Sequence, residues 1–585
     1  MDERTTFLGV ERSVTGRRWT GAGPVLDRAA LQIEQISGLP DLVARLLAEK
    51  GVSPDDVQSY LAPRLRDLMP DPCSLADMDR AAERLSAGVR ARERVAIFGD
   101  YDVDGGASVA LLTDWLDQLG LSATSYIPDR IDEGYGPNVE AMTDLGRQHD
   151  LVICVDCGTL SHEPVAAARA AGADVLIVDH HLPGPELPDA ITVNPNRADD
   201  ASDLGHLCAA GAVFMLLVAT NRLLRGDRDV PELMDMLDLV AVATVADVAP
   251  MIGLNRAFVR TGLGVMAKRQ RHGLVALADV AGLTAPPSAR DLGFALGPRI
   301  NAGGRIGAAD LGARLLSTND PHEAAALAEK LDGLNRERRE IEAAVQDAAS
   351  LQIEERGTGG ALVWAAGDGW HPGVVGIVAS RLKDRFNRPA VVIGIDGDEG
   401  KGSGRSIAGV DLGSSVSALA QSGVLLKGGG HQMAAGLSVE ADRIPEAMDA
   451  LSELLAAQGA DQAGPQDMRV IGALAPAGAT PELVELLEQA GPFGPANAAP
   501  RIAFPDVVPS GVRRVGNGHC QARFGGKDGT LVAIAFGAAD NGIADFLEAA
   551  AGRRQSVHVA GRLEIDDWGG RRKAKLRLED AAAPA

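Results

Sequence analysis

Short apolar runs, each followed by helical sequence, recur along the chain from about residue 93. They are four or five residues long and rich in Val, Ile and Leu, at 95–98, 151–155, 175–178 and 190–193. Runs of this length that alternate with helices are typical of parallel β-strands joined by βαβ crossovers. The pattern therefore predicts an α/β domain with a parallel sheet, which we expect to occupy residues 86–319.

Acidic side chains and two histidines follow these runs, at the points where the strands end. Since the carboxyl ends of parallel strands lie at one edge of a sheet, we expect these side chains to converge there. One further carboxylate follows a later apolar segment. The candidates are Asp100, Asp102, Asp104, Asp156, His180, His181 and Asp247.

This set of side chains predicts a metal site. The first three carboxylates alternate along an extended segment, and like charges so close repel one another unless cations lie among them. Carboxylate oxygens with one or two imidazoles suit Mg²⁺ or Mn²⁺ better than Zn²⁺. Two such ions can activate a water for in-line attack on a phosphate ester. For Asp-Tyr-Asp-Val-Asp alone, a single structural ion or a solvated turn is an equal alternative.

The rest of the chain divides into further predicted segments. Residues 320–356 form one long helix of about 55 Å, which we interpret as a connector, with a packed core helix as the alternative. A second βαβ pattern at 357–460 predicts another, smaller α/β domain. Short β-like runs between Gly-rich turns at 465–585 predict a small barrel. Residues 1–85 are mostly helical in pattern and carry no chemical motif, so they are interpreted as a lead-in.

Composition and charge limit which binding partners and which cellular compartment are expected for this protein. The 585 residues carry a net charge of −23, which disfavours indiscriminate binding to nucleic acid or to an anionic membrane. Residues 511–585 are the exception, with 12 Lys and Arg against 9 Asp and Glu. Five cysteines form no disulfide framework, and Cys154 and Cys157 are interpreted as small buried side chains rather than a redox or zinc pair. With no apolar leader or span, a cytoplasmic protein without membrane partners is expected.

The motifs resemble those of the DHH phosphoesterases. Four stretches carry the likeness in order, GDYDVDG, VDCG, VDHH and TVADVAP. Over residues 70–585 the chain is similar to the bacterial RecJ exonucleases of that family, on stretches such as VNPNR, GPRINAGGRIG, GSGRS, GGGHQMAAG and GPFGPAN. The resemblance implies a 5′-to-3′ exonuclease that degrades single-stranded DNA to nucleoside monophosphates. It implies two Mn²⁺ or Mg²⁺ ions and a role in DNA repair and recombination, as a monomer beside a helicase and a single-strand-binding protein.

The resemblance also implies roles for particular residues. Asp102, Asp104, Asp156, His180 and Asp247 match the metal ligands, while Asp100 and His181 match residues that support the site or the reacting phosphate. The second α/β domain matches the DHH-associated domain, and the barrel matches an OB-fold. Glycine-flanked polar side chains are expected to contact the substrate: the three in GSGRS form a plausible nest for its terminal phosphate, and the histidine of GGGH would hold a nucleotide near the metals. These polar side chains are Arg299, Asn301, Arg305, Ser403, Arg405, Ser406 and His431. The alternatives are an ordinary glycine turn with surface arginines in GPRINAGGR and a structural histidine in GGGH.

The basic barrel is expected to bind the single strand through phosphate contacts and sparse stacking. Phe524 and Trp568 are the stacking candidates, with barrel core and exposed hairpin as the equal alternatives. The densest basic run supplies Arg571, Arg572 and Lys573.

Two positions depart from the family pattern. Phe98 stands where some relatives carry a ligand histidine, so one ion is expected to have one protein ligand fewer. Ala496-Asn497-Ala498 stands where the family has Gly-Asn-Pro, at the entry to the barrel.

Two other functions are compatible with parts of the pattern. One is a DHH phosphodiesterase that acts on short oligonucleotides or cyclic dinucleotides, although such relatives lack the barrel. The other is a scaffold without activity that binds DNA or replication proteins, although such scaffolds lose metal carboxylates that this chain retains.

Overall fold

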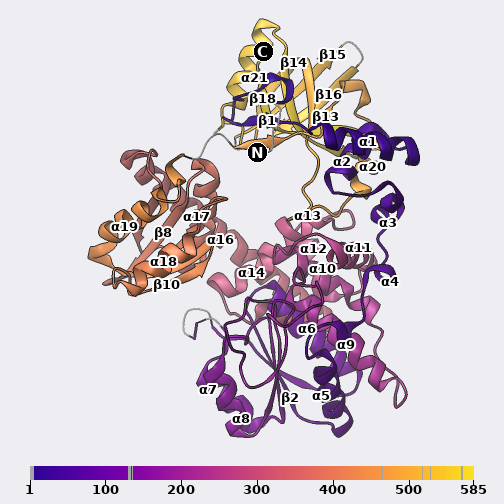
Figure 1. The fold of residues 1–585 in the computed structure, drawn as a ribbon, viewed down its shortest axis with the longest axis vertical. Coiled ribbons are helices and arrows are strands. Elements are labelled where there is room, and N and C mark those ends of the chain that lie inside the picture. The colour runs from indigo at the N-terminus through magenta and orange to yellow at the C-terminus, as the bar shows by residue number, and fades with distance from the viewer. Residues whose placement is uncertain are drawn as a thin grey trace.

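The computed structural model describes residues 6–129, 133–134, 136–462, 466–516, 518–526, 529–539, 541–567 and 571–584. Figure 1 shows three bodies: the DHH-like half below, a second α/β domain at the left and a β-barrel above. Within the described ranges, no helix combines the length and apolar character that a bilayer span requires.

The lower body is built on a parallel five-stranded sheet, as predicted. Its order is β3-β2-β4-β5-β6, and every neighbouring pair is parallel. The edge strand β3 was not predicted, because its sequence Ala-Thr-Ser-Tyr is partly exposed and lacks an apolar run. The strands are β2 (Val95–Gly99), β3 (Ala123–Tyr126), β4 (Leu151–Val155), β5 (Asp174–Val178) and β6 (Ile191–Val193).

Alternate residues of these strands enter two separate cores, because successive side chains point to opposite faces. One face packs with helices α7 and α8, and the other packs with α5, α6, α9 and α10. The bounds are α5 (Met78–Ala91), α6 (Val103–Gln118), α7 (Val139–Gln148), α8 (His162–Ala171), α9 (Ala209–Leu224) and α10 (Leu237–Ala246). The sheet is thus covered on both faces, which leaves its carboxyl edge for the charged side chains.

Further helices complete this body and lead out of it. They are α11 (Gly253–Met266), α12 (His272–Val280), α13 (Ala289–Asp291), the π-helix η5 (Leu292–Leu296), α14 (Gly297–Ile306) and α15 (Leu311–Ser317). The long helix α16 (Pro321–Arg356) begins at Asp320, whose side chain accepts a hydrogen bond from the His322 amide. It runs from α14 and α15 to the second domain, which confirms the connector.

The second domain holds a mixed sheet of order β10-β11-β9-β8-β7, in which only β7 and β8 are parallel. Helix α17 packs against β8, β9 and α16, while α18 packs against β10 and α19. The elements are β7 (Val363–Asp368), α17 (Pro372–Phe386), β8 (Ala390–Asp396), β9 (Glu399–Arg405), α18 (Leu412–Gln421), β10 (Lys427–His431), β11 (Ala434–Glu440) and α19 (Ile444–Ala456).

The C-terminal strands form a closed five-stranded barrel. Strand β14 closes it by pairing with both β15 and β17, and β13 adds to β14 in parallel. The elements are β12 (Asp467–Arg469), β13 (Gly472–Ala473), α20 (Pro481–Gln489), β14 (Ile502–Val515), β15 (His519–Gly526), β16 (Gly529–Ala535), α21 (Ile543–Arg553), β17 (Val557–Asp566) and β18 (Lys573–Ala582).

The N-terminal segment is integral to the barrel rather than a lead-in. Strand β1 (Arg18–Thr20) pairs in parallel with β12, and the buried Trp19 indole donates a 2.9 Å hydrogen bond to Asp580. Helices α1 (Pro24–Ser37) and α2 (Asp41–Glu49) share one apolar core with Phe504 and Phe524. No local pattern signals this association, since the two parts lie more than 400 residues apart. The barrel therefore cannot be removed without exposing the core of residues 18–49.

Arg256 of α11 joins the barrel body to the lower body. Its guanidinium is buried and donates to the carbonyls of Tyr60, Ala490 and Gly491 at 3.0–3.1 Å. It also lies 3.7 Å from the centroid of the Tyr60 ring. Helices α3 (Val57–Leu61) and α4 (Leu65–Leu68) carry the chain down this side. One buried cation thus holds the N-terminal segment and the barrel entry together.

The barrel entry includes a residue in an unfavourable backbone conformation. Ala496 has φ 57°, in the left-handed region where an L-residue with a Cβ is strained by about 1–2 kcal/mol. The neighbouring Pro495 carbonyl accepts a 2.8 Å hydrogen bond from the Met251 amide, so the turn is fixed from both sides. Glycine, which has no Cβ, would adopt this conformation without that strain.

We expect Ala496→Gly to stabilise the protein by about 0.5–1 kcal/mol, because relief of strain exceeds the added entropy of the unfolded chain. Ala498→Gly is the control, since Ala498 is not in a left-handed conformation and its replacement should be neutral or destabilising. Urea denaturation of both variants measures the effect. A loss of stability in Ala496→Gly would contradict the strain argument.

Candidate active site

The charged side chains lie at the carboxyl edge of the parallel sheet. Asp100 follows β2, Asp156 follows β4, and His180 and His181 follow β5. Asp102 is the N-cap of α6, where its carboxylate accepts hydrogen bonds from the amides of the next turn. Asp247 enters from the C-terminal end of α10 rather than from a strand. The fold therefore brings all seven predicted residues toward one edge.

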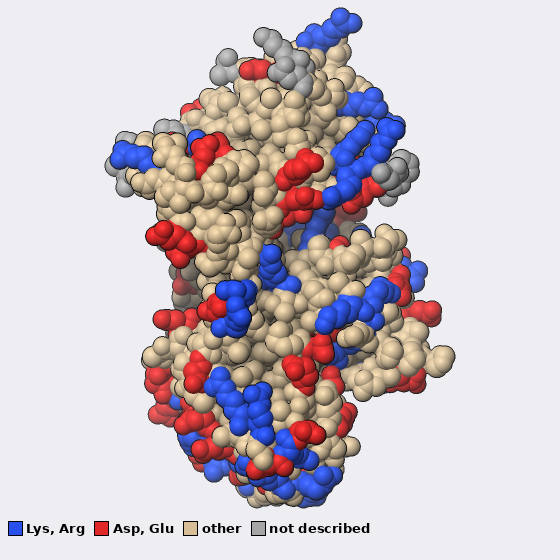
Figure 2. All heavy atoms as spheres, turned by 90° about the vertical axis from the view of Figure 1, so that its right-hand side faces the viewer, with Lys and Arg blue, Asp and Glu red and all other residues tan. Residues whose placement is uncertain are grey.

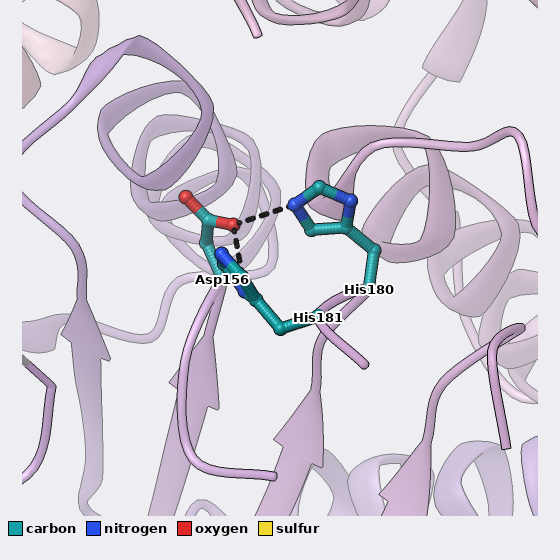
Figure 3. Close-up of side chains that lie close together, drawn as sticks. All are labelled: Asp156, His180 and His181. Atoms are coloured by element: carbon teal, nitrogen blue, oxygen red, sulfur yellow. Dashed lines mark ion pairs between the residues drawn. The ribbon is translucent and has the colours of Figure 1, made fainter. Parts of the chain in front are cut away.

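Their ligand atoms form three overlapping groups, in each of which all atoms lie within 4.8 Å of one another. The His180 Nε2 atom lies 3.2 Å from Asp156, 3.7 Å from Asp104 and 3.9 Å from Asp247. Figure 3 shows both imidazole rings turned toward the Asp156 carboxylate. Among the described residues the groups are Asp156-His180-His181, Asp104-His180-Asp247 and Asp100-Asp102-Asp156. Asp156 and His180 each belong to two groups, so neighbouring ions could share them.

Backbone geometry holds two of the carboxylates in place. Asp156 has φ 59°, an uncommon conformation for a residue with a side chain and one that is often found at functional sites. The buried Asp104 carboxylate accepts hydrogen bonds from the amides of Ala209 and Ala210, at 2.6 and 2.8 Å. These amides begin α9, so the positive end of that helix offsets part of the negative charge.

A second set of residues, which the site prediction omitted, orients the two histidines. Asp179 accepts a 2.8 Å hydrogen bond from His181 Nδ1 and further bonds from the amides of His180 and His181. Asn194 and Asn196 donate to the carbonyls of His181 and His180. The stretch VNPNR was visible in the sequence, but its contact with the histidines depends on the parallel pairing of β5 and β6.

Burial and mutual repulsion shape the protonation of the site. Burial raises the pKa of Asp104 and of Asp156, and for Asp156 the charges of Asp104 and Asp102 raise it further. Burial, with the same two neighbours, raises the pKa of Asp247 to about 8. For His181 burial opposes the charge, yet the hydrogen bond to Asp179 raises its pKa to about 9. Because these carboxylates repel one another when all are ionised, bound divalent cations would stabilise their ionised form.

The donor set fits Mg²⁺ or Mn²⁺. It consists of carboxylate oxygens with imidazole nitrogens, and no described thiol joins any of the three groups. Cys154 and Cys157 are buried, as predicted, and burial raises the pKa of Cys154 to about 12. Phe98 is also fully buried and stacks on Tyr126 with ring centroids 5.3 Å apart. This position therefore provides packing and no ligand.

The segment GPRINAGGR supports the metal loop instead of offering glycines to a phosphate. A Cβ on Gly304 would lie 2.8 Å from the Tyr101 carbonyl oxygen, so the glycine allows α14 to pack on that loop. The Asn301 side-chain oxygen accepts a 3.1 Å hydrogen bond from the Val103 amide. Arg299 is paired with Asp332 of α16, and Arg305 donates to the Gly373 carbonyl of α17. The two arginines thus tie the lower body to the connector and the second domain.

Two of the predicted phosphate contacts lie together on the second domain. Arg405 Nη1 donates to Ser403 Oγ at 3.0 Å, and a Cβ on Gly376 of α17 would lie 3.0–3.2 Å from these two side chains. His431 is exposed at the end of β10. Ser406 corrects the expectation, because it is fully buried and its hydroxyl donates to the Val410 carbonyl. It closes a turn and is not placed to contact a phosphate.

The structure of the barrel corrects part of the predicted contacts with single-stranded DNA. Phe524 is fully buried in the barrel core, so its ring cannot stack on a base. Trp568 lies outside the described residues. Arg571, Arg572 and Lys573 are exposed, and Arg572 forms an ion pair with Glu485 at 2.7 Å. On the face in Figure 2, positive and negative side chains are interspersed, as the net charge of −23 leads one to expect.

We expect Mn²⁺ to bind more weakly as the pH falls from 8.5 to 6.5. Because the folded protein keeps Asp247 protonated below about 8 without a cation, Mn²⁺ must displace that proton, which weakens binding about tenfold per pH unit for each proton displaced. Calorimetric titrations in two buffers of different ionisation enthalpy measure affinity and proton release. An affinity that is independent of pH, without proton release, would contradict this account.

Comparison with known proteins identifies three regions of the chain. Residues 94–244 match the DHH family, N-terminal domain, residues 358–457 match the DHHA1 domain, and residues 472–580 match the RecJ OB domain. These ranges lie within the predicted domains 86–319, 357–460 and 465–585, whose limits remain predictions.

Whole-chain relatives agree with these matches. The chain is 34% identical to the single-stranded-DNA-specific exonuclease RecJ of Bacillus subtilis (strain 168), over 97% of this chain and 71% of that protein. It is 35% identical to the RecJ of Escherichia coli (strain K12), over 93% and 96%. The crystal structure of Thermus thermophilus RecJ in complex with Mn²⁺ has a TM-score of 0.79 and 27% identity, with 97% and 80% covered. The chain therefore belongs to the RecJ family of DHH proteins.

Proposed function

We propose that this protein is a metal-dependent exonuclease that degrades single-stranded DNA from the 5′ end and releases nucleoside 5′-monophosphates. The observation that carries the proposal is the set of three ligand groups that share Asp156 and His180. The RecJ relatives are named single-stranded-DNA-specific exonucleases, which supports the choice of substrate. We further propose a monomer in the cytoplasm that acts in DNA repair and recombination, with a helicase and a single-strand-binding protein.

Two divalent ions would be held by Asp102, Asp104, Asp156, His180 and Asp247, where they supply water activation and neutralise charge on the reacting phosphate. The chain's own side chains orient the groups that contact the reacting phosphate. Asp179 holds His181 as an imidazolium, whose other ring nitrogen can donate to a phosphate oxygen. Asp100, buried in the third group, adds negative charge that favours retention of the cations.

The 5′-to-3′ direction of digestion would come from recognition of the strand's terminal phosphate. Arg405 and Ser403 form a compact pair of donors on β9, and Arg305 joins the lower body to the same domain through Gly373. Guanidinium groups bind phosphate oxygens strongly through parallel hydrogen bonds. A phosphate held there, with the next ester at the metal site, would be cut only from the 5′ end. The match to a RecJ OB domain disfavours the smaller phosphodiesterases as the alternative.

Loss of the carboxylate that two ligand groups share should abolish chemistry while leaving strand binding intact. Asp156→Ala should reduce cleavage of end-labelled single strands by about a thousandfold or more, because charge neutralisation by metal contributes several kcal/mol. Affinity for the same strand, measured by anisotropy in EDTA, should change little. Asp55→Asn, which alters an exposed carboxylate far along the chain, is the control. Near-normal cleavage by Asp156→Ala would overturn the metal site.

Removal of the phosphate-binding guanidinium should affect strands according to their 5′ end. Arg405→Ala should slow digestion of 5′-phosphorylated strands at least tenfold more than digestion of 5′-hydroxyl strands, since only the former lose a charge-assisted contact. Arg443→Ala, which removes an exposed ion pair of the same domain, is the matched control. An equal effect on the two substrates would remove this pocket from the proposal.

A further inference from the structure

Two aromatic rings are exposed in a protein that has few aromatic residues. Among the aromatic side chains that the structure describes, only Phe294 and Phe536 are more than about a third exposed, at 81% and 44%. Full burial of a phenylalanine side chain is worth about 1.5–3 kcal/mol, and these two rings forgo much of it. The two residues lie 242 positions apart in the sequence, in different bodies of the molecule.

Phe294 lies on a segment that packs against the end of α10. It belongs to the π-helix η5, a conformation that is frequent at functional sites. Cβ atoms on the neighbouring Gly293 and Gly297 would lie 3.2–3.4 Å from side chains of Val245 and Ala246. Those two residues directly precede the candidate ligand Asp247. The π-helix therefore packs on the end of α10, the helix that leads into Asp247, and leaves its phenylalanine exposed.

The same segment faces the barrel. Arg290, one helical turn before Phe294, forms a 3.0 Å ion pair with Glu564 of β17. Glu564 also lies 3.7 Å from the guanidinium of Arg577 on β18. That guanidinium lies over the Phe536 ring, 5.3 Å from its centroid. These contacts connect Arg290, four residues before Phe294, to the Phe536 ring across the junction, where Figure 1 shows α13 beneath the barrel.

The barrel surface around Phe536 combines cations with apolar side chains. Register pairs Arg523 with Val532 and Val532 with Lys575, and it pairs Ile534 with Arg577. Because residues two apart share one face of a strand, Val532 and Ile534 lie on the outer side of β16, opposite the buried Leu531 and Ala533, and the exposed Phe536 follows in the turn after the strand. Alternating positive and apolar groups beside an exposed ring are the features that bind single strands, through phosphate contacts and base stacking.

We propose that Phe294 and Phe536 are base-stacking residues that carry the single strand from the metal site across the domain junction to the outer barrel face of Arg523, Lys575 and Arg577. The inference rests on the proposed function, since it takes single-stranded DNA as the substrate. It places the stacking contacts on side chains other than Phe524 and Trp568. A protein partner at the same rings is less favoured, because the Arg577 guanidinium lies over the Phe536 ring in a chain of net charge −23.

The test measures binding of the full-length protein to a 20-nucleotide oligo(dT) in EDTA, so that no cleavage occurs. Phe294→Ala and Phe536→Ala should each weaken binding by about 5- to 150-fold, the range spanned by loss of one base–aromatic stack. Phe294→Trp should restore affinity to within about twofold of the unsubstituted protein. Leu351→Ala is the matched control, an exposed apolar residue on α16 that should leave binding unchanged. Thermal melts confirm that every variant is folded.

An abasic strand of the same length separates stacking from other roles. The alanine variants should bind it as the unsubstituted protein does, because it offers phosphates without bases. Equal weakening on both strands, or binding of oligo(dT) within twofold of normal in both variants, would overturn the inference. If the unsubstituted protein failed to bind or cut oligo(dT) at all, the proposed function itself would fail, which is a distinguishable result.

Discussion

Mutual repulsion among buried carboxylates is the constraint on which the site depends. Asp100, Asp104 and Asp156 are each almost fully buried, and burial with neighbouring charge raises the pKa of the last two. Such a cluster is unfavourable unless cations or backbone dipoles compensate it. The α9 amides and the charged His181 provide part of that compensation, and cations held by the three ligand groups would provide the rest. The site's affinity for metal ions follows from this need for positive charge beside the buried carboxylates.

Rigid surroundings keep the charged groups close in spite of that repulsion. Asn194 and Asn196 hold the backbone of the two histidines, and Asn301 with Gly304 anchors α14 on the loop that carries Asp102. These contacts join consecutive strands and a later helix, so the ligand positions are set by packing rather than by the loops themselves. Preorganised ligands of this kind lose little entropy when a metal or substrate binds.

The three bodies are linked by arginine hydrogen bonds as well as by the covalent chain. The buried Arg256 ties the barrel entry to α11, close to the turn after Asp247, and the partly buried Arg305 ties α14 to the second domain. Carbonyl oxygens offset the cost of burying the Arg256 cation. The proposed terminal-phosphate contacts, the metal site and the barrel are therefore held in one arrangement, which a nuclease that threads a single strand requires.

Local sequence patterns were sufficient to predict most of the parallel sheet, the connector helix, the barrel, and the gathering of carboxylates and histidines at the strand ends. A run of apolar residues and the carboxylate after it occupy neighbouring positions, and parallel topology then brings the ends together. Long-range packing alone determines that residues 18–49 complete the barrel, that Ser406 and Phe524 are buried, and that Phe294 and Phe536 are exposed. Burial of a given side chain depends on segments far away in the chain, and no local pattern encodes those contacts.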